Sequence, residues 1–368
     1  MGESESIYRL ALTQVPQIGC VLARALTDKF GSAEAIFNAS KKALCEVDGI
    51  SQVKAGYIKS FRDFDPLEKE LAFLQKSGVD MLFITDGGYP KRLLNCYDPP
   101  TLLFYKGTGD LNTGRIVNII GTRNPTDYGR QLTDKLVETL AQHNIMVVSG
   151  LAFGIDTQAH KASLKNNLPT VGVLAHGLDT IYPSENAKLA RTILEQGGGL
   201  LTEFPSGTKP DKHNFPTRNR VVAGLCDATI VVETDIKGGS MITADLAIGY
   251  NRDVFAFPGK VTDAKSRGCN WLIRQNKAAL ISNGDELLET MNWLPHPEKK
   301  PKVQRSLFIE LTPQEKTIVD LLTSREQMHI DELNLKSGLP PSSAAGALLS
   351  LELQGVVARM PGKLYKLV

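Results

Sequence analysis

The chain has 368 residues, of which 42% are hydrophobic and 22% are charged, as in an ordinary soluble globular protein. No segment approaches the roughly 18 uncharged apolar residues of a membrane span, and the N-terminus lacks the apolar region of a signal peptide, so neither is expected. The net charge of +2 is too small to indicate a partner, so any binding of nucleic acid must depend on local charge.

Cysteine usage indicates the compartment. The five cysteines are scattered along the chain, and none of them belongs to a C-x-x-C pair. An odd, unpaired set favours a reducing compartment and argues against zinc. We therefore expect a cytoplasmic protein that holds no metal and no cofactor.

The first 65 residues are predicted to form a small helical domain. The stretches "VPQIG", at Val15–Gly19, and "VDGIS", at Val47–Ser51, each lie between runs with helical periodicity. This repetition looks like paired helix-hairpin-helix units, in which the backbone N–H groups of a Gly-x-Gly turn hold a DNA phosphate. Each copy lacks one glycine of that turn, at Gln17 and at Ser51. A purely structural role and a DNA-contacting role are both open at this point.

Residues 66–293 are predicted to form the core of the protein. After a helix, a strand and a turn, apolar runs alternate with helical patterns such as 128–143, 184–196 and 240–250. The apolar runs are 115–120, 145–148, 170–174, 199–204, 228–233 and 253–257. Buried parallel strands have this nearly unbroken apolar character, and alternation with helices gives βαβ units. The expected fold class is therefore α/β, with a doubly wound, Rossmann-like parallel sheet.

Two further segments follow the core. Residues 294–308 replace periodicity with proline and charge, which is typical of a linker. Residues 309–368 then form a compact unit, whose first helix is expected to begin with a capping box. Its N-cap would be Thr312, with Pro313 at the first helical position and Glu315 at the third.

Glycine recurs in the segments that follow the predicted strands, namely 121–124, 149–156, 175–179, 203–220, 233–244 and 257–260. Ligands of such sheets bind outside the carboxyl ends of the strands, where glycine allows close backbone approach and helix N-termini favour anions. A phosphate-binding site is therefore expected there. The sequence contains neither the G-x-x-x-x-G-K-[ST] motif for a nucleoside triphosphate nor a G-x-G-x-x-G after the first strand.

Segment 205–220 is locally basic. It contains four cations against one acid, together with an aromatic residue, Phe215, that we expect in mid-loop. Basic residues with an interleaved aromatic suit a single nucleic-acid strand, since the cations contact phosphates and the ring contacts a base. The alternatives are that Phe215 anchors the loop in the core, that Lys212 is merely solvated, and that Arg220 pairs with a core carboxylate.

Other polar residues at the strand ends are interpreted as structural. Asp156 and His160 are four apart but lack a third ligand at matching spacing, so Asp156 is expected near a helix N-terminus and His160 against the sheet. Glu203 has no paired acid or nucleophile, which favours a hydrogen-bonding role. Ser149 and Ser240 lack a His-Asp arrangement of the triad type. No catalytic residue is predicted.

Five longer motifs follow one another along the core. They are "SGLAFGID", "HGLDTIYPSEN", "FPTRNRVVAGL", "KGGSMITADLA" and "FPGK…GCNWLI". In this order they resemble the DprA/Smf family of bacterial DNA-processing proteins, and the flanking regions fit as well. The resemblance implies a cytoplasmic, homodimeric protein that binds single-stranded DNA entering during natural transformation. It also implies that the protein protects this strand and loads a RecA-type recombinase onto it, without catalysing a reaction.

In that family, a pocket at the strand ends holds the DNA through a G-S/T-R, a K-x-x-F and an R-N-R motif and a glycine-serine loop. The matching residues here are Arg123, Lys212, Phe215, Arg218, Asn219, Arg220, Gly238, Gly239 and Ser240. Self-association is expected near Trp271, Leu272 and Ile273, although a buried helix would explain this apolar run equally well. The sequence departs from the family at Thr122, where serine is usual, and in "RQNKA", which lacks the usual glycine near Asn276.

The C-terminal unit looks like a winged helix, a fold often used to read a major groove. Its expected recognition helix, 341–354, contains no Lys or Arg and one Glu, whereas phosphate and base contacts favour basic or amide side chains. A protein-contact or dimer-supporting role is therefore favoured, and a transcriptional regulator that reads duplex DNA is disfavoured. Arg359, Lys363 and Lys366 on the expected wing could still contact a backbone.

An enzyme is the main alternative, because the sheet also resembles nucleotide-binding relatives that hydrolyse nucleoside monophosphates. Those relatives carry P-G-G-x-G-T-x-x-E, whose glutamate takes part in the chemistry. Here Gly238 and Gly239 are followed by "SMITADLA", which has no glutamate at the matching place. We therefore expect a DNA-binding protein rather than an enzyme.

Overall fold

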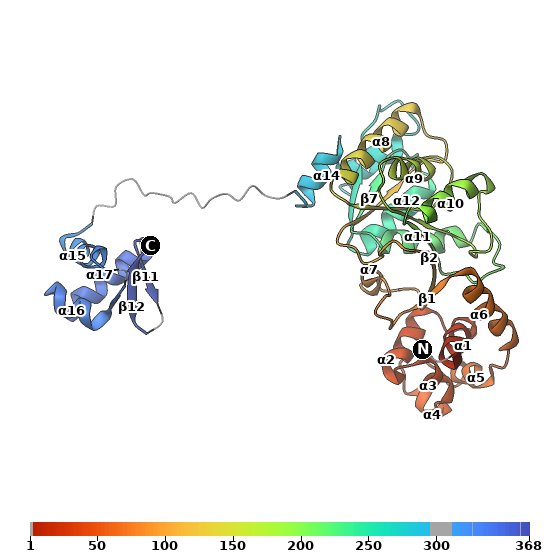
Figure 1. The fold of residues 1–368 in the computed structure, drawn as a ribbon, viewed down its shortest axis with the longest axis horizontal. Coiled ribbons are helices and arrows are strands. Elements are labelled where there is room, and N and C mark those ends of the chain that lie inside the picture. Colours follow the sequence, from red (N-terminus) through yellow and green to blue (C-terminus); the bar gives the residue numbers. More distant parts are fainter. Residues whose placement is uncertain (1–2, 295–310, 326, 361) are drawn as a thin grey trace. The chain divides into compact units, whose positions relative to one another are not determined.

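The computed structural model describes residues 3–294, 311–325, 327–360 and 362–368. The chain divides into two compact units, Met1–Pro295 and His296–Val368 (Figure 1). The predicted linker 294–308 lies, apart from its first residue, outside the described residues. Within the part of the chain that the structure describes, no helix combines the length and the apolar character needed to cross a membrane.

Six helices open the larger unit, as the periodicity of this region predicts. They are α1 Glu3–Gln14, α2 Cys20–Phe30, α3 Ala33–Asn38, α4 Lys41–Cys45, α5 Gln52–Ser60 and α6 Asp65–Ser77. The two predicted hairpin turns separate α1 from α2 and α4 from α5. Gln17 adopts a φ of 62°, a left-handed conformation that glycine takes most readily, and Gly49 has a φ of 82°. The helix-hairpin-helix geometry is therefore formed even though one copy has glutamine in its turn.

The N-terminal helices share one hydrophobic core with the sheet that follows. Buried residues of these helices, such as Leu26, belong to the same cluster as Leu103 of the sheet. Arg24 of α2 donates a hydrogen bond to the main-chain oxygen of Leu94 at 3.1 Å. In Figure 1 these helices, drawn in red and orange, lie at one end of the unit, next to β1. The first hairpin therefore packs on the core.

The core contains a nine-stranded sheet in the order β1-β2-β6-β5-β4-β3-β7-β8-β9. Its strands are β1 Asp80–Phe83, β2 Leu102–Gly107, β3 Ile116–Ile120, β4 Met146–Ser149, β5 Thr170–Val173, β6 Gly199–Thr202, β7 Ala228–Val231, β8 Asp253–Ala256 and β9 Ala279–Leu280. In the order of the sheet, the seven strands β6-β5-β4-β3-β7-β8-β9 are all parallel to one another, which confirms the predicted α/β class. The sheet is nevertheless mixed, because β1 pairs antiparallel with β2 and β2 with β6.

Helices cover both faces of this sheet. One face carries α8 Asp127–Gln142, α9 Ile155–Lys165, α10 Ala187–Glu195 and α14 Gly284–Thr290, and the other carries α11 Asn214–Gly224 and α12 Gly239–Gly249. The remaining elements of this unit are α7 Lys91–Leu94, η1 Ser184–Asn186 and α13 Arg267–Arg274. The predicted helices are thus present, and the first turn of the one expected at 184–196 is a 3-10 helix. Because helices cover both faces, side chains on either side of a strand are buried, which explains why the strands are apolar throughout.

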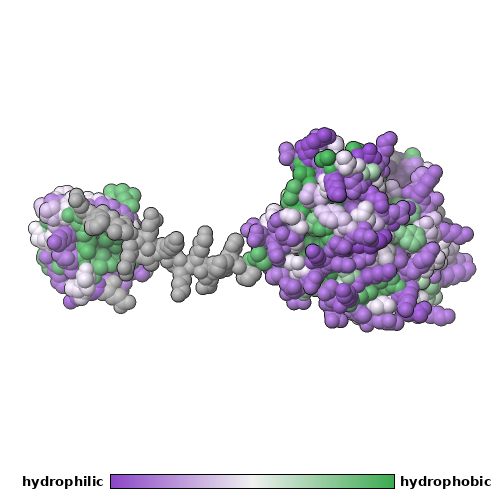
Figure 2. Space-filling view, turned by 90° about the horizontal axis from the view of Figure 1, so that it is seen from above, coloured by the Kyte–Doolittle hydropathy of each residue, from purple (hydrophilic) through white to green (hydrophobic). Residues whose placement is uncertain are grey.

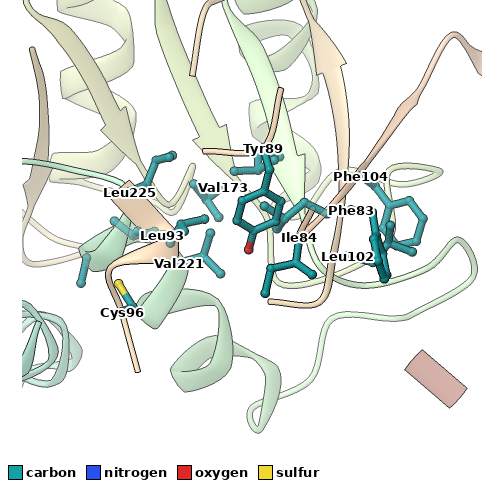
Figure 3. Packing of buried hydrophobic residues seen from close by; sticks show 14 of the residues in the cluster. Phe83, Ile84, Tyr89, Leu93, Cys96, Leu102, Phe104, Val173, Val221 and Leu225 are labelled. Carbon is teal, nitrogen blue, oxygen red and sulfur yellow. The ribbon is translucent and has the colours of Figure 1, made fainter. Parts of the chain in front are cut away.

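Helix α11 is fixed against the sheet by its apolar side. Val221 of this helix and Leu225, its C-cap residue, pack with Val173 of β5 around the ring of Tyr89 (Figure 3). The Tyr89 hydroxyl is buried and donates to the main-chain oxygen of Pro100 at 2.6 Å, so the ring brings no unpaired donor into the core. This packing leaves the first turn of α11 at the carboxyl ends of the strands.

The smaller unit has the element order of a winged helix. Its elements are α15 Pro313–Thr323, β10 Met328–His329, α16 Ile330–Ser337, α17 Pro341–Leu353, β11 Val357–Met360 and β12 Leu364–Leu367. The three strands form an antiparallel sheet in the order β10-β12-β11. The predicted capping box is confirmed, because the Thr312 side chain accepts from the Glu315 N–H and the Glu315 carboxylate accepts from the Thr312 N–H at 2.8 Å.

Candidate nucleic-acid interface

A cavity of about 500 Å³ opens at the carboxyl ends of β3, β4 and β7. The chain leaves β3 toward β4 on one side and later returns to β7 on the other, so this is where the strand order reverses. Open α/β sheets bind their ligands at such a point. The lining includes Gly121, Thr122, Arg123, Gly150, Asp156, Lys212, Phe215, Arg218, Asn219, Thr234, Asp235, Gly238, Gly239 and Ser240. Eight of the nine predicted site residues therefore meet in one place.

We call Arg123, Lys212, Phe215, Gly238 and Gly239 the rim of this cavity. Arg123 and Lys212 are exposed, whereas Phe215 is half-buried. The Arg123 guanidinium lies 5.4 Å from the centroid of the Phe215 ring. At this distance a cation and an aromatic face attract each other. The rim thus combines two solvent-accessible positive charges with an accessible aromatic surface.

Phe215 is not in mid-loop, as the sequence analysis expected, but in the first turn of α11. Pro216 follows it within that turn, where the missing N–H has no intrahelical acceptor in any case. A proline in the first turn therefore starts a helix instead of interrupting one. Phe215 also contacts the ring of Tyr182, with the centroids 6.2 Å apart.

The glycine-serine loop forms the N-terminus of helix α12. Its N-cap is Gly238, and no side chain among the described residues caps this helix. A Cβ at Gly238 would lie 2.2 Å from the Thr234 hydroxyl oxygen, whereas a Cβ at Gly239 would meet no protein atom within 4 Å. Ser240 is buried below them and donates to the Thr234 hydroxyl at 2.6 Å. The Gly238 N–H donates to the Asp235 oxygen at 2.9 Å, so the N–H groups that this helix N-terminus offers to an anion are those of Gly239 and Ser240.

We call Gly150, Asp156 and Arg218 the floor of the cavity. Arg218 is only 6% exposed, and its guanidinium donates to the main-chain oxygens of Gly150 and Val173. Asp156 accepts from the Gly150 N–H at 3.1 Å. Burial raises the pKa of Asp156, and the positive charge of Arg218 opposes that rise. Arg218 is predicted to contact a phosphate, but its guanidinium already donates to main-chain oxygens at the strand ends.

Asn219 and Arg220 complete the R-N-R motif. Asn219 lines the cavity and accepts a hydrogen bond from Arg218 Nε at 3.0 Å. Arg220 lies outside the cavity lining and pairs with Glu203, which is the alternative considered for it in the sequence. Burial raises the pKa of Glu203 to about 7, although Arg220 acts in the opposite direction. Arg220 also lies 4.0 Å from the Asp98 carboxylate, so one guanidinium serves two acids.

The remaining polar residues have the structural surroundings that the sequence suggested. His160 is buried, its Nδ1 pairs with the Thr170 hydroxyl at 2.8 Å, and burial lowers the pKa of His160 to about 3. Ser149 donates to the main-chain oxygen of Ile119 at 2.7 Å. Both side chains therefore belong to the interior of the sheet.

Two aromatic residues near the cavity were missed as site candidates. Phe153 and Tyr182 line a smaller hollow next to the cavity and are 41% and 46% exposed. They add exposed aromatic surface beside the cavity. The available signal was their position inside the quoted motifs "SGLAFGID" and "HGLDTIYPSEN".

The apolar run "WLI" is only partly accessible. Leu272 is fully buried in α13, whereas Trp271 and Ile273 are partly buried. The buried-helix explanation therefore holds for Leu272, which is unavailable to a second copy of the chain. Asn276, where the family usually has a nearby glycine, takes a φ of 54°. Asparagine is among the few other residues that tolerate this left-handed conformation.

Helix α17 of the smaller unit presents a face without cations. Leu349 and Leu353 are 58% and 81% exposed on it. Figure 2 shows a hydrophobic area on the visible side of this unit, whereas hydrophilic residues cover most of the visible face of the larger one. The expected recognition helix thus offers no lysine or arginine to a phosphate backbone.

Family models match almost the whole chain. Residues 80–292 match the model for DNA recombination-mediator protein A. Residues 304–363 match the DprA winged helix domain, and residues 10–61 match a SAM-like helix-hairpin-helix tandem. The chain belongs to the DprA/Smf family. The expectation drawn from the five sequence motifs is therefore confirmed.

Relatives in this family are similar over their full length or over the core. Protein Smf of Synechocystis sp. is 34% identical over an alignment of 402 positions that covers 100% of both chains. DNA processing protein DprA of Bacillus subtilis is 42% identical over 237 residues, covering 64% of this chain and 80% of its own.

Solved structures of the family agree with this fold. The structure of DprA from Streptococcus pneumoniae superimposes with a TM-score of 0.67 and 32% identity, covering 77% of this chain and 97% of its own. A structure of Helicobacter pylori DprA is described for its single-stranded DNA binding mode. It superimposes with a TM-score of 0.53 and 34% identity, covering 58% of this chain and 96% of its own.

Proposed function

We propose that this protein binds single-stranded DNA in the strand-end cavity, with phosphates at the rim cations and one base against Phe215. The observation that carries the proposal is a single open cavity holding two exposed cations, an accessible ring and an uncapped helix N-terminus. Bases of a single strand are free to stack on a ring, whereas those of a duplex are already stacked. The single-stranded DNA binding described for the H. pylori relative supports the same ligand.

The predicted site residues have two different roles in this proposal. Arg123 and Lys212 neutralise phosphates, and the N–H groups of Gly239 and Ser240 donate to the oxygens of a further one, next to Gly238 at the start of α12. Asn219, which lines the cavity, offers an amide to the strand. Arg218 and Arg220 act indirectly, because their guanidinium groups hold the first turns of α11 against the strand ends and against Glu203.

The direct test is a competition between single-stranded and duplex DNA of equal length. The full chain should prefer the single strand, because only that strand offers unstacked bases to Phe215. Equal affinity for both forms would overturn the proposal. A second test removes residues 306–368, which should leave binding largely intact, since the cations and the ring all belong to the larger unit.

We further propose that a cytoplasmic homodimer protects the bound strand and loads a RecA-type recombinase onto it. Membership of the DprA/Smf family supports this role. The test measures how fast a purified RecA-type recombinase assembles on single-stranded DNA with and without this protein. We expect acceleration by the wild type and none by the Arg123→Ala/Lys212→Ala double variant. Light scattering tests the dimer, and a monomeric mass at working concentration would contradict it.

The protein is proposed to bind DNA without catalysis. Two acids line the cavity, and both have structural partners, because Asp156 accepts from backbone N–H groups and Asp235 pairs with Arg267 at 2.9 Å. We therefore propose neither of them as a general base. Incubation with nucleoside monophosphates should release no base, and release above a heat-inactivated control would favour the hydrolase alternative.

A further inference from the structure

Helix α6 contacts the start of the basic segment that leads to Lys212. Glu70 of α6 is buried, and its carboxylate accepts two hydrogen bonds from Ser206. One comes from the Ser206 N–H at 2.9 Å and the other from its hydroxyl. The two residues are 136 positions apart in the chain. Bonds to an ionised acceptor are among the stronger ones, so this is a tertiary anchor on the segment.

A second contact holds the same turn from its other side. The Gly207 N–H donates to the Asp179 carboxylate at 2.9 Å, and the Gly177 N–H donates to the Thr208 oxygen at 3.1 Å. A Cβ at Gly177 would come within 2.9 Å of the Ser206 Cα, which shows how closely the two segments pack. The turn is therefore clamped between α6 and the loop after β5.

The chain between this clamp and α11 is exposed. Lys209, Asp211 and Lys212 are all exposed, and α11 begins at Asn214. Lys212 thus lies on a short exposed segment whose two ends are fixed, one by α11 and the other by the clamped turn. Loss of either anchor would let the segment sample more conformations, and binding would then have to order it again.

We propose that Glu70 is a positioning residue for DNA binding, which orders the segment that presents Lys212 to the cavity. The inference rests on the proposed function, because the position of Lys212 matters to a ligand only if the cavity binds the strand. The direction in which affinity changes when Glu70 is removed distinguishes positioning from charge repulsion. An acid near a phosphate backbone repels it, so a purely electrostatic role predicts tighter binding when the acid is removed, whereas positioning predicts weaker binding.

The experiment compares Glu70→Ala and Glu70→Gln in the full chain. A glutamine keeps both hydrogen bonds without the charge, since its oxygen accepts from the Ser206 N–H and its NH₂ group donates to the hydroxyl. Affinity for a labelled oligothymidylate and the rate of trypsin cleavage after Lys212 are measured. Lys209 precedes Pro210 and resists trypsin, so this cleavage reports on the segment. Glu68→Ala, an exposed acid on the same helix, is the matched control for charge.

Glu70→Ala should weaken binding by about 3- to 10-fold, the range expected when one side chain must be ordered on binding. It should also speed cleavage after Lys212, while Glu70→Gln and Glu68→Ala stay close to wild type in both measurements. Wild-type affinity and cleavage in Glu70→Ala would overturn the proposal. Tighter binding by Glu70→Ala, Glu70→Gln and Glu68→Ala alike would replace it with charge repulsion.

Two further outcomes separate this inference from its premises. If Glu70→Ala melts below the assay temperature, Ser206→Ala is measured in its place, because it removes only the hydrogen bond from the hydroxyl to Glu70. Ser206→Ala should then weaken binding and speed cleavage after Lys212, both to a smaller extent. Wild-type affinity and cleavage in Ser206→Ala would overturn the proposal. If the wild-type chain binds no single-stranded DNA, the proposed function fails. Cleavage after Lys212 then still tests whether Glu70 orders the segment.

Discussion

The rim and the floor of the strand-end cavity both contain arginine, but the surroundings of the two are opposite. Arg123 in the rim is exposed and lies against an aromatic ring. Arg218 in the floor is 6% exposed and donates to the main-chain oxygens of Gly150, directly after β4, and of Val173, the last residue of β5. An exposed guanidinium keeps its donors for a ligand, whereas a buried one must satisfy them within the protein. The comparison teaches that two arginines of one cavity differ in what they can offer, since the donors of Arg123 are accessible to a ligand and those of Arg218 hold the strand ends together.

The same contrast appears within the R-N-R motif. Arg218 and Arg220 are two positions apart on a helix, so their side chains point about 200° apart. One reaches under the cavity, and the other reaches Glu203 beside the N-terminal helices. The two arginines look like one positive patch in the sequence, but in the structure they stabilise two different parts of the protein.

The largest effect is expected for the floor. Arg218→Ala leaves the buried Asp156 carboxylate without its nearby positive charge and leaves the Gly150 and Val173 oxygens without their donor. Breaking such a buried arrangement costs roughly 3–5 kcal/mol of unfolding free energy. Urea denaturation measures it, with Arg123→Ala as the exposed control, expected within about 0.5 kcal/mol of wild type. Equal stability of the two variants would erase the distinction between rim and floor.

Arg220→Ala should cost less, about 2–3 kcal/mol near pH 8, because its side chain is partly exposed. Its loss leaves Glu203 unpaired, and the pKa of Glu203, already raised to about 7, should rise further. A carboxyl whose folded-state pKa is raised destabilises the fold as the pH rises through that pKa. The defect should therefore shrink as the pH falls from about 8 to about 5. Thermal melts across this range measure it, and a defect independent of pH would exclude Glu203 as its cause.

Phe215→Ala should lower the affinity for single-stranded DNA by roughly 1–3 kcal/mol, the usual loss when a base loses its aromatic partner. Phe215→Tyr keeps the ring and should bind like wild type. Tyr128→Ala serves as the control, since Tyr128 is 48% exposed but lies outside the cavity lining. Equal losses in Phe215→Ala and Tyr128→Ala, measured by fluorescence anisotropy, would show that the Phe215 ring is not specific to the site.

Gly239→Ala should have the smallest effect, with a loss of affinity of about tenfold, or 1.4 kcal/mol. Its methyl group meets no protein atom within 4 Å and would occupy space left for a phosphate. The melting temperature should not fall, because alanine is favoured over glycine in a helix. Gly238→Ala is the contrast, since its Cβ would overlap Thr234 and destabilise the fold. Unchanged affinity in a folded Gly239→Ala variant would remove the helix N-terminus from the proposed site.

The strands, the helices and the capping box could be predicted because each depends on local pattern. Thr312, Pro313 and Glu315 are three residues whose types alone specify a helix start. Strand β2 could not be placed from pattern, because an apolar run does not state its direction. Its antiparallel partner toward the parallel strands is β6, which follows it only after three other strands of the sheet, so no local pattern shows this pairing.

The gathering of rim residues at the strand ends could be predicted from glycine and charge, but the burial of Arg218 could not. The sequence around Phe215 predicts a loop, where neighbouring side chains have no fixed angular relation. In helix α11 each side chain has a defined direction, and that direction decides which arginine is buried. The contacts of Arg218 with the strand ends are also 45 and 68 residues away in the chain, beyond any local pattern.

The most direct test of the account is the salt dependence of single-stranded DNA binding in the Arg123→Ala/Lys212→Ala double variant. Each phosphate neutralised on a single strand contributes roughly −0.7 to the slope of log K against log salt. The account predicts that the double variant flattens this slope by about 1.4 while melting like wild type, and that Lys260→Ala, an exposed lysine outside the cavity lining, leaves it unchanged. A folded double variant that keeps the full wild-type slope would contradict the claim that the rim holds the phosphates.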